Sequence, residues 1–160
     1  MRIIKKKYNI VVAGGGIAGI SAALKAAGYG ADVLLIEHYG FTGGMSTAGM
    51  VSPFMKYSVG SQPLVQGVFN ALEEEMRSMG GMIDNGFYAS SFRSAACRLL
   101  KYSGCNVMLS SDIYSVNIKN GLIVSVDAVS YGIKYNISAD VFIDTTGDAQ
   151  LTYLAGLPCR

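Results

Sequence analysis

A glycine-rich stretch near the start of the sequence has the spacing of a phosphate-binding turn. The pattern G-x-G-x-x-G runs through Gly14, Gly15, Gly16, Ile17, Ala18 and Gly19. Gly14 permits a tight turn, Gly16 lets the backbone approach a pyrophosphate, and Gly19 lets a helix pack closely on a strand. Unpaired N–H groups at the start of that helix would bind the anion. The spacing therefore predicts a site for a dinucleotide.

An acidic residue follows this turn at the expected distance. Glu37 stands 23 positions after Gly14 and closes the next apolar run, where its carboxylate would accept hydrogen bonds from ribose hydroxyls. If this were the glycine turn of some other α/β fold, the position of the acidic residue Glu37 at the end of the next strand would be a coincidence. The adjacent His38 is expected on the adenosine side of the site. NAD(P) and FAD share the ADP half, so the turn and the acid leave both cofactors open.

Hydrophobic patterning predicts the elements that position these residues. An apolar, β-branched run over 8–13 predicts a strand, and the alanine-rich stretch over 17–27 predicts a helix. The continuous apolar run over 32–37 is typical of a strand buried on both faces of a parallel sheet. Two more helices and one more parallel strand are predicted over 64–79, 92–102 and 107–109.

The last third of the chain predicts a different arrangement. Alternating apolar residues predict a three-stranded antiparallel β-meander, over 114–118, 122–128 and 133–137. Asn120-Gly121 marks its first hairpin turn. Val141 to Ile143 is predicted as a separate buried strand, with a helix starting near Ala149. The fold class expected is α/β, a Rossmann-like FAD- or NAD(P)-binding domain with a parallel sheet, helices and this meander.

A second glycine pair adds a family resemblance. The run from Glu37 to Thr47, with its Gly43-Gly44 pair, resembles the two-dinucleotide-binding-domain flavoproteins, in which such a pair covers the cofactor. The meander that leads into Asp144-Thr145-Thr146-Gly147-Asp148 is similar to that of FAD-dependent oxidoreductases related to fumarate reductase flavoproteins. The resemblance spans nearly the whole chain. It implies non-covalently bound FAD and disfavours a domain that takes only NAD(P).

The resemblance also implies roles for the loop that holds the glycine pair. Gly43 and Gly44 would pass next to the pyrophosphate and the ribityl chain, with Met45 following in the same loop. Ser46 or Thr47 would approach the reactive side of the flavin. An equally open reading makes these two residues ordinary polar loop residues.

Three residues near the end of the predicted sheet receive roles in the same way. Thr146 and Gly147 would lie close to the ADP half of FAD, and backbone groups around Ile113 would meet the adenine. No residue stands out as a catalytic acid or base. The flavin itself would carry the electrons, and the protein would supply orientation and electrostatics.

Composition excludes several other classes of function. His38 is the only histidine, which argues against a Ser/His/Asp triad or a multi-histidine metal site. Cys97, Cys105 and Cys159 are odd in number and lack metal-ligand spacing, so neither a disulfide framework nor a metal site is expected. A formal charge of +2 without a basic cluster disfavours nucleic acid. The expected partner is a small-molecule substrate.

The N-terminal region superficially looks like a signal peptide. Lys5, Lys6 and Lys7 precede an uncharged run over 8–24, but three consecutive glycines in its middle would each weaken a helix by roughly 1 kcal/mol. A strand followed by a tight turn uses them instead. The sequence therefore predicts a cytoplasmic protein without a membrane segment.

The length of the chain predicts one domain, and two hypotheses of its function remain. Residues 1–160 are expected to form the N-terminal part of an FAD-binding domain, with 45–90 as a loop and helix insertion. The substrate domain and the C-terminal return segment of the resembled family are not visible. The chain is thus expected to be an FAD-dependent oxidoreductase, or its N-terminal portion, that moves hydride or electrons to or from a small molecule. The alternative is a truncated, non-catalytic fragment that binds ADP-like ligands weakly or folds only with a partner. A second chain or a missing C-terminal domain would then complete the FAD site.

Overall fold

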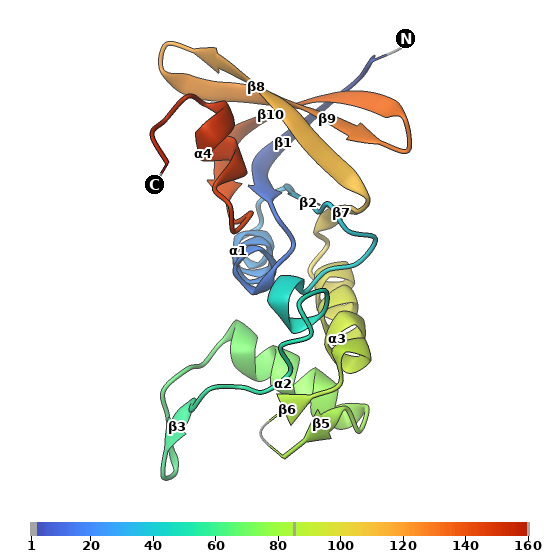
Figure 1. Ribbon diagram of the computed structural model, residues 1–160, viewed down its shortest axis with the longest axis vertical. Helices are drawn as coiled ribbons and strands as arrows, with labels where there is room; N and C mark the ends of the chain where they lie inside the picture. Colours follow the sequence, from blue (N-terminus) through green and yellow to red (C-terminus); the bar gives the residue numbers. More distant parts are fainter. Residues whose placement is uncertain (1–2, 85, 160) are drawn as a thin grey trace.

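A six-stranded sheet forms the centre of the computed structural model, which describes residues 3–84 and 86–159 (Figure 1). Its strands are β1 (Ile3–Ala13), β2 (Val33–Ile36), β7 (Asn106–Met108), β8 (Ser111–Lys119), β9 (Leu122–Ser130) and β10 (Ile133–Asp144). They lie in the order β7-β2-β1-β10-β9-β8. The chain therefore builds one side of the sheet from β1 outward and later returns to the other side of β1.

The carboxyl ends of the three central strands meet at one edge of the sheet. β7, β2, β1 and β10 run parallel, and Ala13 pairs with Ile36 on one side and with Asp144 on the other. The strand order reverses direction at β1, and ligands of open α/β sheets bind outside the carboxyl ends of strands at such a point. The topology therefore predicts a ligand site at the residues that follow Ala13, Ile36 and Asp144.

The predicted meander is present and is continuous with the parallel sheet. β8, β9 and β10 pair antiparallel in sequence order. Asn120 and Gly121 connect β8 to β9 with φ values of 52° and 76°. Positive φ at both central residues is what a tight type I′ hairpin requires.

The sequence prediction was wrong in dividing the last strand region in two. The stretches over 133–137 and 141–143 belong to one strand, β10, because β1 pairs with it in parallel along nearly its whole length. β1 likewise begins at Ile3 rather than at residue 8. Polar residues in these strands interrupt the apolar pattern, but backbone pairing does not depend on side-chain type.

The outer edge of β10 is paired over only part of its length. β9 pairs with residues 133–138, whereas β1 on the other side continues to Asp144. Among the described residues no strand pairs with the outer edge over 139–144. Val141 is consequently 50% exposed, so the prediction of a fully buried strand was wrong at this position.

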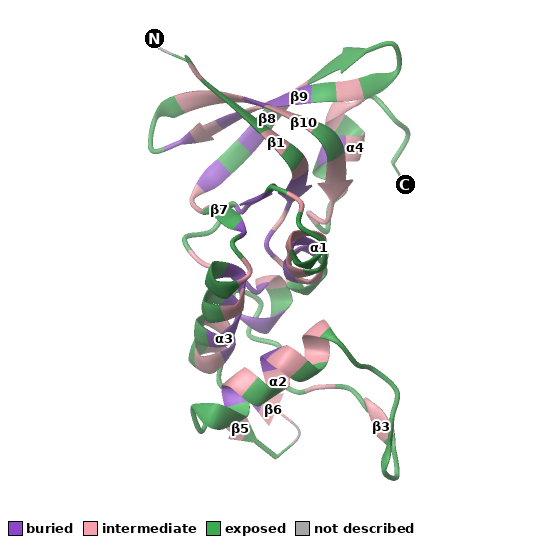
Figure 2. Ribbon diagram, turned by 180° about the vertical axis from the view of Figure 1, so that it is seen from behind, coloured by how far each residue is buried: buried purple, intermediate pink, exposed green. Residues whose placement is uncertain are grey.

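Helices cover one face of the parallel strands, and the meander and a short helix cover the other. The helices are α1 (Ile17–Gly28), α2 (Val68–Ser78), α3 (Ala89–Tyr102) and α4 (Gln150–Leu154). Val12 and Leu35 pack in a buried cluster with α1, α2 and α3, while Val11 and Leu34 pack with the meander and α4. Figure 2 shows the buried residues gathered between these layers.

The segment between β2 and α3 contains short elements that patterning did not resolve. They are the 3-10 helix η1 (Gly44–Ser46) and the hairpin strands β3 (Ser58–Val59), β4 (Gln62–Pro63), β5 (Met82–Ile83) and β6 (Gly86–Phe87). α2 starts at Val68 instead of residue 64, because Gly67 has a φ of 76° that a helix does not continue through. α3 starts three residues earlier than predicted.

No helix within residues 3–84 and 86–159 combines the length and the apolar character that crossing a membrane requires.

Candidate functional site

Two glycines of the N-terminal motif are required by the fold itself. Gly14 follows β1 with a φ of 95°, and a Cβ atom there would lie 2.5 Å from the carbonyl oxygen of Thr145. A Cβ atom on Gly19 would lie 1.8 Å from the carbonyl oxygen of Gly14. Both contacts are with backbone, which cannot move aside as a flexible side chain can. Gly19 therefore lets α1 pack directly on the end of β1, and Gly14 lets the turn pass against the residues that follow β10.

Gly16 is different, because its missing side chain leaves open space. It precedes the first residue of α1 with a φ of −69°, and a Cβ atom there would meet no heavy atom within 4 Å. No side chain caps the start of α1, and its first turn contains no acidic residue. The N–H groups of this turn are thus available to an anion, at the positive end of the helix dipole.

Glu37 is a buried carboxylate held by the glycine turn. Its side chain is only 6% exposed. Oε2 accepts a hydrogen bond of 2.6 Å from the N–H of Gly15, and Oε1 accepts one of 2.7 Å from the N–H of Tyr39. A Cβ atom on Gly15 would lie 2.8 Å from Oε2 and 3.0 Å from the Cβ atom of Glu37, so a side chain there would shift the carboxylate. Each carboxylate oxygen keeps acceptor capacity for a further donor such as a hydroxyl.

The Gly43-Gly44 pair packs directly against the N-terminal glycine turn. The N–H of Gly43 donates a 2.7 Å hydrogen bond to the carbonyl oxygen of Gly15. A Cβ atom on Gly44 would lie 3.0 Å from the Cα atom of Gly16. Gly43 and Gly44 have φ values of 120° and 52°, which favour glycine. The loop after β2 thus forms a wall beside the phosphate-binding turn.

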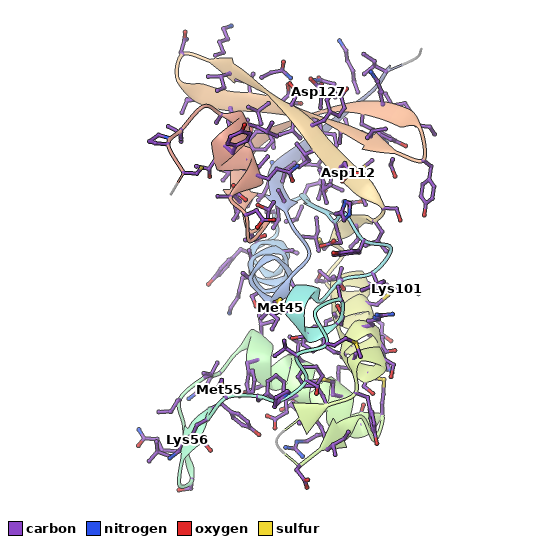
Figure 3. The ribbon with its side chains drawn as sticks, in the orientation of Figure 1. Met45, Met55, Lys56, Lys101, Asp112 and Asp127 are labelled. Atoms are coloured by element: carbon purple, nitrogen blue, oxygen red, sulfur yellow. The ribbon has the colours of Figure 1, made fainter. Side chains whose placement is uncertain are left out.

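The structure does not place Ser46 and Thr47 at the surface of the site. They are 4% and 0% exposed, and the Thr47 hydroxyl donates a 3.0 Å hydrogen bond to the carbonyl oxygen of Thr42. Both lie inside the loop and support it, which agrees with the reading of these two as ordinary polar loop residues. Met45, which is 65% exposed, faces the cleft instead and is labelled beside α1 in Figure 3.

The end of β10 is tied to the glycine turn by threonine hydroxyls. The Thr145 hydroxyl contacts the carbonyl oxygens of Ala13 and Gly14 at 2.7 and 2.9 Å. The Asp144 carboxylate accepts hydrogen bonds from the backbone and hydroxyl groups of Thr146 and Thr152. Burial alone would raise the pKa of Asp144, but these hydrogen bonds outweigh it and the pKa is lowered. The carboxylate stays charged and orders the loop after β10.

Side chains from α4 complete the end of the site that lies nearest the meander. The Gln150 amide donates a 2.9 Å hydrogen bond to the carbonyl oxygen of Ile113, and Thr146 accepts one of 2.8 Å from the Gln150 N–H. Gln150 and Tyr153 line the cleft, and sequence reasoning missed both. Neither residue belongs to a motif, so no local signal pointed to them.

An exposed histidine–aspartate pair joins two strands at the same end. Nδ1 of His38, just beyond β2, lies 2.5 Å from Oδ1 of Asp112 in β8. This hydrogen bond and the charge of Asp112 raise the pKa of His38 above its ordinary value of 6.5. Both side chains line the cleft, and Figure 3 labels Asp112 at its position on the meander.

These elements enclose a cleft of about 1120 Å³ at the carboxyl edge of the sheet. Cavities for drug-sized ligands usually measure about 300–1,000 Å³, so this one admits a larger molecule such as a dinucleotide. The predicted site residues that line it are Gly14, Gly16, Ile17, Ala18, Glu37, His38, Gly44, Met45, Ile113, Thr146 and Gly147. The predicted residues outside this lining are Gly15, Gly19, Gly43, Ser46 and Thr47.

The cleft has the chemistry of a binding site and no evident nucleophile. Burial raises the pKa of the Cys105 thiol to about 11, so this thiol stays protonated, and it is not among the lining residues. Within the part of the chain that the structure describes, no group of three or more His, Cys, Asp or Glu residues could hold a metal ion. The arrangement suits a nucleotide, and its histidine–carboxylate pair, His38 with Asp112, lies at the end of the cleft nearest the meander.

Comparisons with known proteins agree with this geometry. The model of the family described as FAD dependent oxidoreductase matches residues 9–160. No curated protein sequence matches the chain at a significant level.

Solved structures of redox proteins share the fold. L-proline dehydrogenase from P. horikoshii is 15% identical, with a TM-score of 0.70 over 98% of this chain and 58% of its own. The flavin-dependent brominase Bmp2 is 16% identical, with a TM-score of 0.71 over 95% of this chain and 41% of its own. A flavocytochrome c3 fumarate reductase is 17% identical, with a TM-score of 0.62 over 87% of this chain and 33% of its own. At such identities the likeness shows the fold, and the chain spans less than two thirds of each of these proteins.

Proposed function

Because the chain belongs to the FAD dependent oxidoreductase family, we propose that the cleft binds FAD and that the protein moves hydride or electrons to or from a small molecule. FAD is the cofactor of this family. When bound, it supplies the two-electron redox chemistry, which no side chain of the cleft could perform. The contribution of this chain is to bind and orient the cofactor.

The proposed orientation follows the polarity of the cleft. The adenosine lies at the end built from Glu37, His38 and Ile113, where the buried carboxylate accepts hydrogen bonds from the ribose hydroxyls. The pyrophosphate lies over Gly16, against the uncapped start of α1. The ribityl chain and the flavin ring continue past Gly44 and along Met45. Each part of FAD thus meets groups of matching character.

The single observation that carries this proposal is the space over Gly16. The other glycines of the N-terminal motif are packed against protein atoms, whereas a Cβ atom on Gly16 would project into the open cleft. A glycine that the fold does not require, beside an uncapped helix start, is explained by close approach of a ligand to the backbone.

A second polypeptide segment is part of the proposal. The outer edge of β10 is unpaired over residues 139–144 among the described residues, although Val141 and Phe142 there are apolar. Unpaired strand edges can pair with another strand. We propose that a strand from outside residues 1–160, in the same or another chain, covers this edge.

A binding portion without catalysis of its own is the second candidate. The flavin end of the cleft is lined by Met45, Ala48 and Gly49, none of which can donate or accept a proton. In this alternative the chain holds FAD, and residues of another polypeptide contact the substrate.

The cellular setting is proposed to be the cytoplasm. Cys97, Cys105 and Cys159 are free thiols, and Cys97 and Cys159 are exposed. Free exposed thiols persist in reducing compartments. This supports the location without depending on the FAD site.

The test compares Gly16→Val with Gly16→Ala. Both variants fold normally, because the backbone of Gly16 is extended and no atom obstructs a Cβ atom. Valine fills the space of the pyrophosphate and weakens FAD binding by about 100-fold, whereas alanine has a smaller effect. Fluorescence titration of apoprotein with FAD measures the affinities, and thermal melting without FAD verifies the folds. Equal FAD affinity in wild type and Gly16→Val would refute the site.

ADP and NAD⁺ distinguish the remaining alternatives in the same titration. ADP should compete with FAD for the Glu37 end of the cleft. NAD⁺ that binds more tightly than FAD would favour a domain that takes only NAD(P). An FAD-loaded protein that turns over no substrate until another polypeptide is added would favour the binding-portion candidate.

A further inference from the structure

A second cavity adjoins the cofactor cleft and has no role in the function proposed above. It measures about 300 Å³ and lies between α1, the segment before α2, α2 itself and α3. Ile17, the first residue of α1, lines both cavities, so the two cavities meet there. The two are otherwise lined by different residues.

The walls of this cavity are apolar and well packed. Phe54, Phe69 and Phe92 contribute aromatic rings, with Phe54 and Phe69 at a centroid distance of 5.0 Å and an interplanar angle of 68°. Leu72 and Phe92 belong to the buried core and are only 4% and 1% exposed. The cavity is therefore bounded by residues that the core holds in place. Such a surface suits the hydrocarbon or aromatic part of a ligand.

The polar groups of the cavity come from one face of α1 and from the segment before α2. Ile17, Ser21 and Lys25 are spaced by four residues, which places them on the same face of the helix. Gln66 adds an amide. Within residues 3–84 and 86–159, Lys25 forms no ion pair. The cavity thus combines apolar walls with an ammonium group that has no carboxylate partner.

We propose that this cavity binds a small carboxylate with an aromatic or short aliphatic body. The apolar part packs on Phe54 and Phe69, and the carboxylate pairs with Lys25 and accepts hydrogen bonds from Ser21 or Gln66. A cationic ligand is disfavoured by the charge of Lys25. A volume of about 300 Å³ holds on the order of ten non-hydrogen atoms, if each occupies about as much as a water molecule in the liquid.

The contact with Lys25 distinguishes the proposed carboxylate site from a purely apolar cavity. A neutral apolar ligand would gain only burial, whereas a carboxylate also gains a hydrogen-bonded ion pair with the exposed ammonium group of Lys25. The carboxylate should therefore bind more tightly than its amide of the same shape. The difference should disappear when the ammonium group is removed.

The experiment titrates the FAD-reconstituted protein, or the apoprotein in parallel, with 4-phenylbutyrate and with 4-phenylbutanamide. Amide NMR shifts of Gly67 and Phe69 locate binding, and the titration gives both dissociation constants. Small ligands of this size bind in the range of about 0.1 to 10 mM, and the carboxylate is expected to bind about threefold more tightly than the amide, because the ammonium group of Lys25 is exposed. Lys25→Met should remove that threefold preference.

Two further variants complete the design. Lys101→Met is the matched control, because Lys101 also lies in the last turn of its helix but does not line the cavity. It should leave both constants unchanged. Val68→Trp should fill the cavity and abolish binding of both compounds.

The proposal is overturned if 4-phenylbutyrate causes no shift at about 20 mM, or if its preference over the amide persists in Lys25→Met. Binding that survives Val68→Trp would place the ligand elsewhere and overturn it as well. FAD affinity should be equal in wild type and Lys25→Met, so failure here is distinguishable from failure of the FAD site.

Discussion

The turn between β1 and α1 and the segment over 50–65 both consist largely of irregular backbone, but they differ in how far their residues are buried. In the turn, irregular backbone is buried and paired, as in the contacts of Gly15 with Glu37 and of Thr145 with Gly14. In the segment, apolar side chains face outward, with Met50 72% exposed and Met55 88% exposed. Figure 3 labels Met55 and Lys56 on the stretch that leads into the β3–β4 hairpin, which extends away from the body of the molecule.

This difference shows which irregular segment is held in its conformation by contacts within the chain. The nucleotide end is held by short-range backbone contacts, so its geometry does not require another molecule. The exposed segment offers apolar surface instead, which in soluble proteins marks regions that interact with something else. The comparison predicts that substitutions in the turn act on folding or on cofactor binding, whereas substitutions of the outward-facing methionines of the segment, Met50 and Met55, affect neither.

The largest effect is expected for Gly19→Ala. Replacing glycine by alanine inside a helix normally stabilises a protein by about 0.5–1 kcal/mol. At Gly19 the new Cβ atom would lie 1.8 Å from the carbonyl oxygen of Gly14, and relief would separate α1 from β1. We expect the free energy of unfolding to fall by about 3 kcal/mol or more, measured by urea denaturation.

Gly28→Ala is the matched control for that prediction. Gly28 is the last residue of α1, and a Cβ atom there would meet no heavy atom within 4 Å. This variant should be neutral or slightly stabilised. If Gly19→Ala proved as stable as Gly28→Ala, the close packing of α1 on β1 would be wrong.

Sequence reasoning located the nucleotide end because its determinants are local. The glycine spacing and Glu37 lie within one strand–turn–helix–strand unit, where each residue type has a conformational reason that is visible in the sequence. The contacts of Thr145 and Gln150 were not predicted as such, because they join residues separated by more than 30 positions. Only the pairing of β10 with β1 brings Thr145 beside the glycine turn.

The other end of the site was predicted less well for a related reason. A loop sequence does not reveal which side chains turn inward, so flavin contact and an ordinary loop role were equally open for Ser46 and Thr47, and the structure buries both. The Thr47 hydroxyl is used by a carbonyl group of its own loop. Polar residues in glycine-rich loops serve the backbone as readily as a ligand.

An intermediate effect is expected for the histidine–aspartate pair at the adenosine end. His38 has a pKa raised above 6.5 by Asp112, so the pair stabilises the folded state fully below the unfolded pKa. That stability is lost as the pH rises through the higher folded pKa. His38→Gln should therefore melt about 1 °C below wild type near pH 5.5 and with it near pH 9, because an exposed pair contributes little.

Asp112→Asn provides the check on this pair. If His38 acts through Asp112, the double variant should show the same pH dependence as either single variant. A difference between wild type and His38→Gln that grows with pH would contradict the sign derived from the raised pKa.

The smallest effect is expected for Met55→Ser. Met55 is 88% exposed, so its removal leaves no cavity and should change the free energy of unfolding by less than about 0.5 kcal/mol. Met76→Ser is the contrasting variant, because Met76 is 0% exposed in the core and its loss should cost about 3 kcal/mol or more. FAD affinity, measured in the same titration, should be unchanged in Met55→Ser. If Met55→Ser were destabilised as much as Met76→Ser, Met55 would be packed against the rest of the protein, and the comparison with the glycine turn would fail. If it is neutral, the exposed side of the segment is free to pack against another molecule without any loss at the nucleotide end.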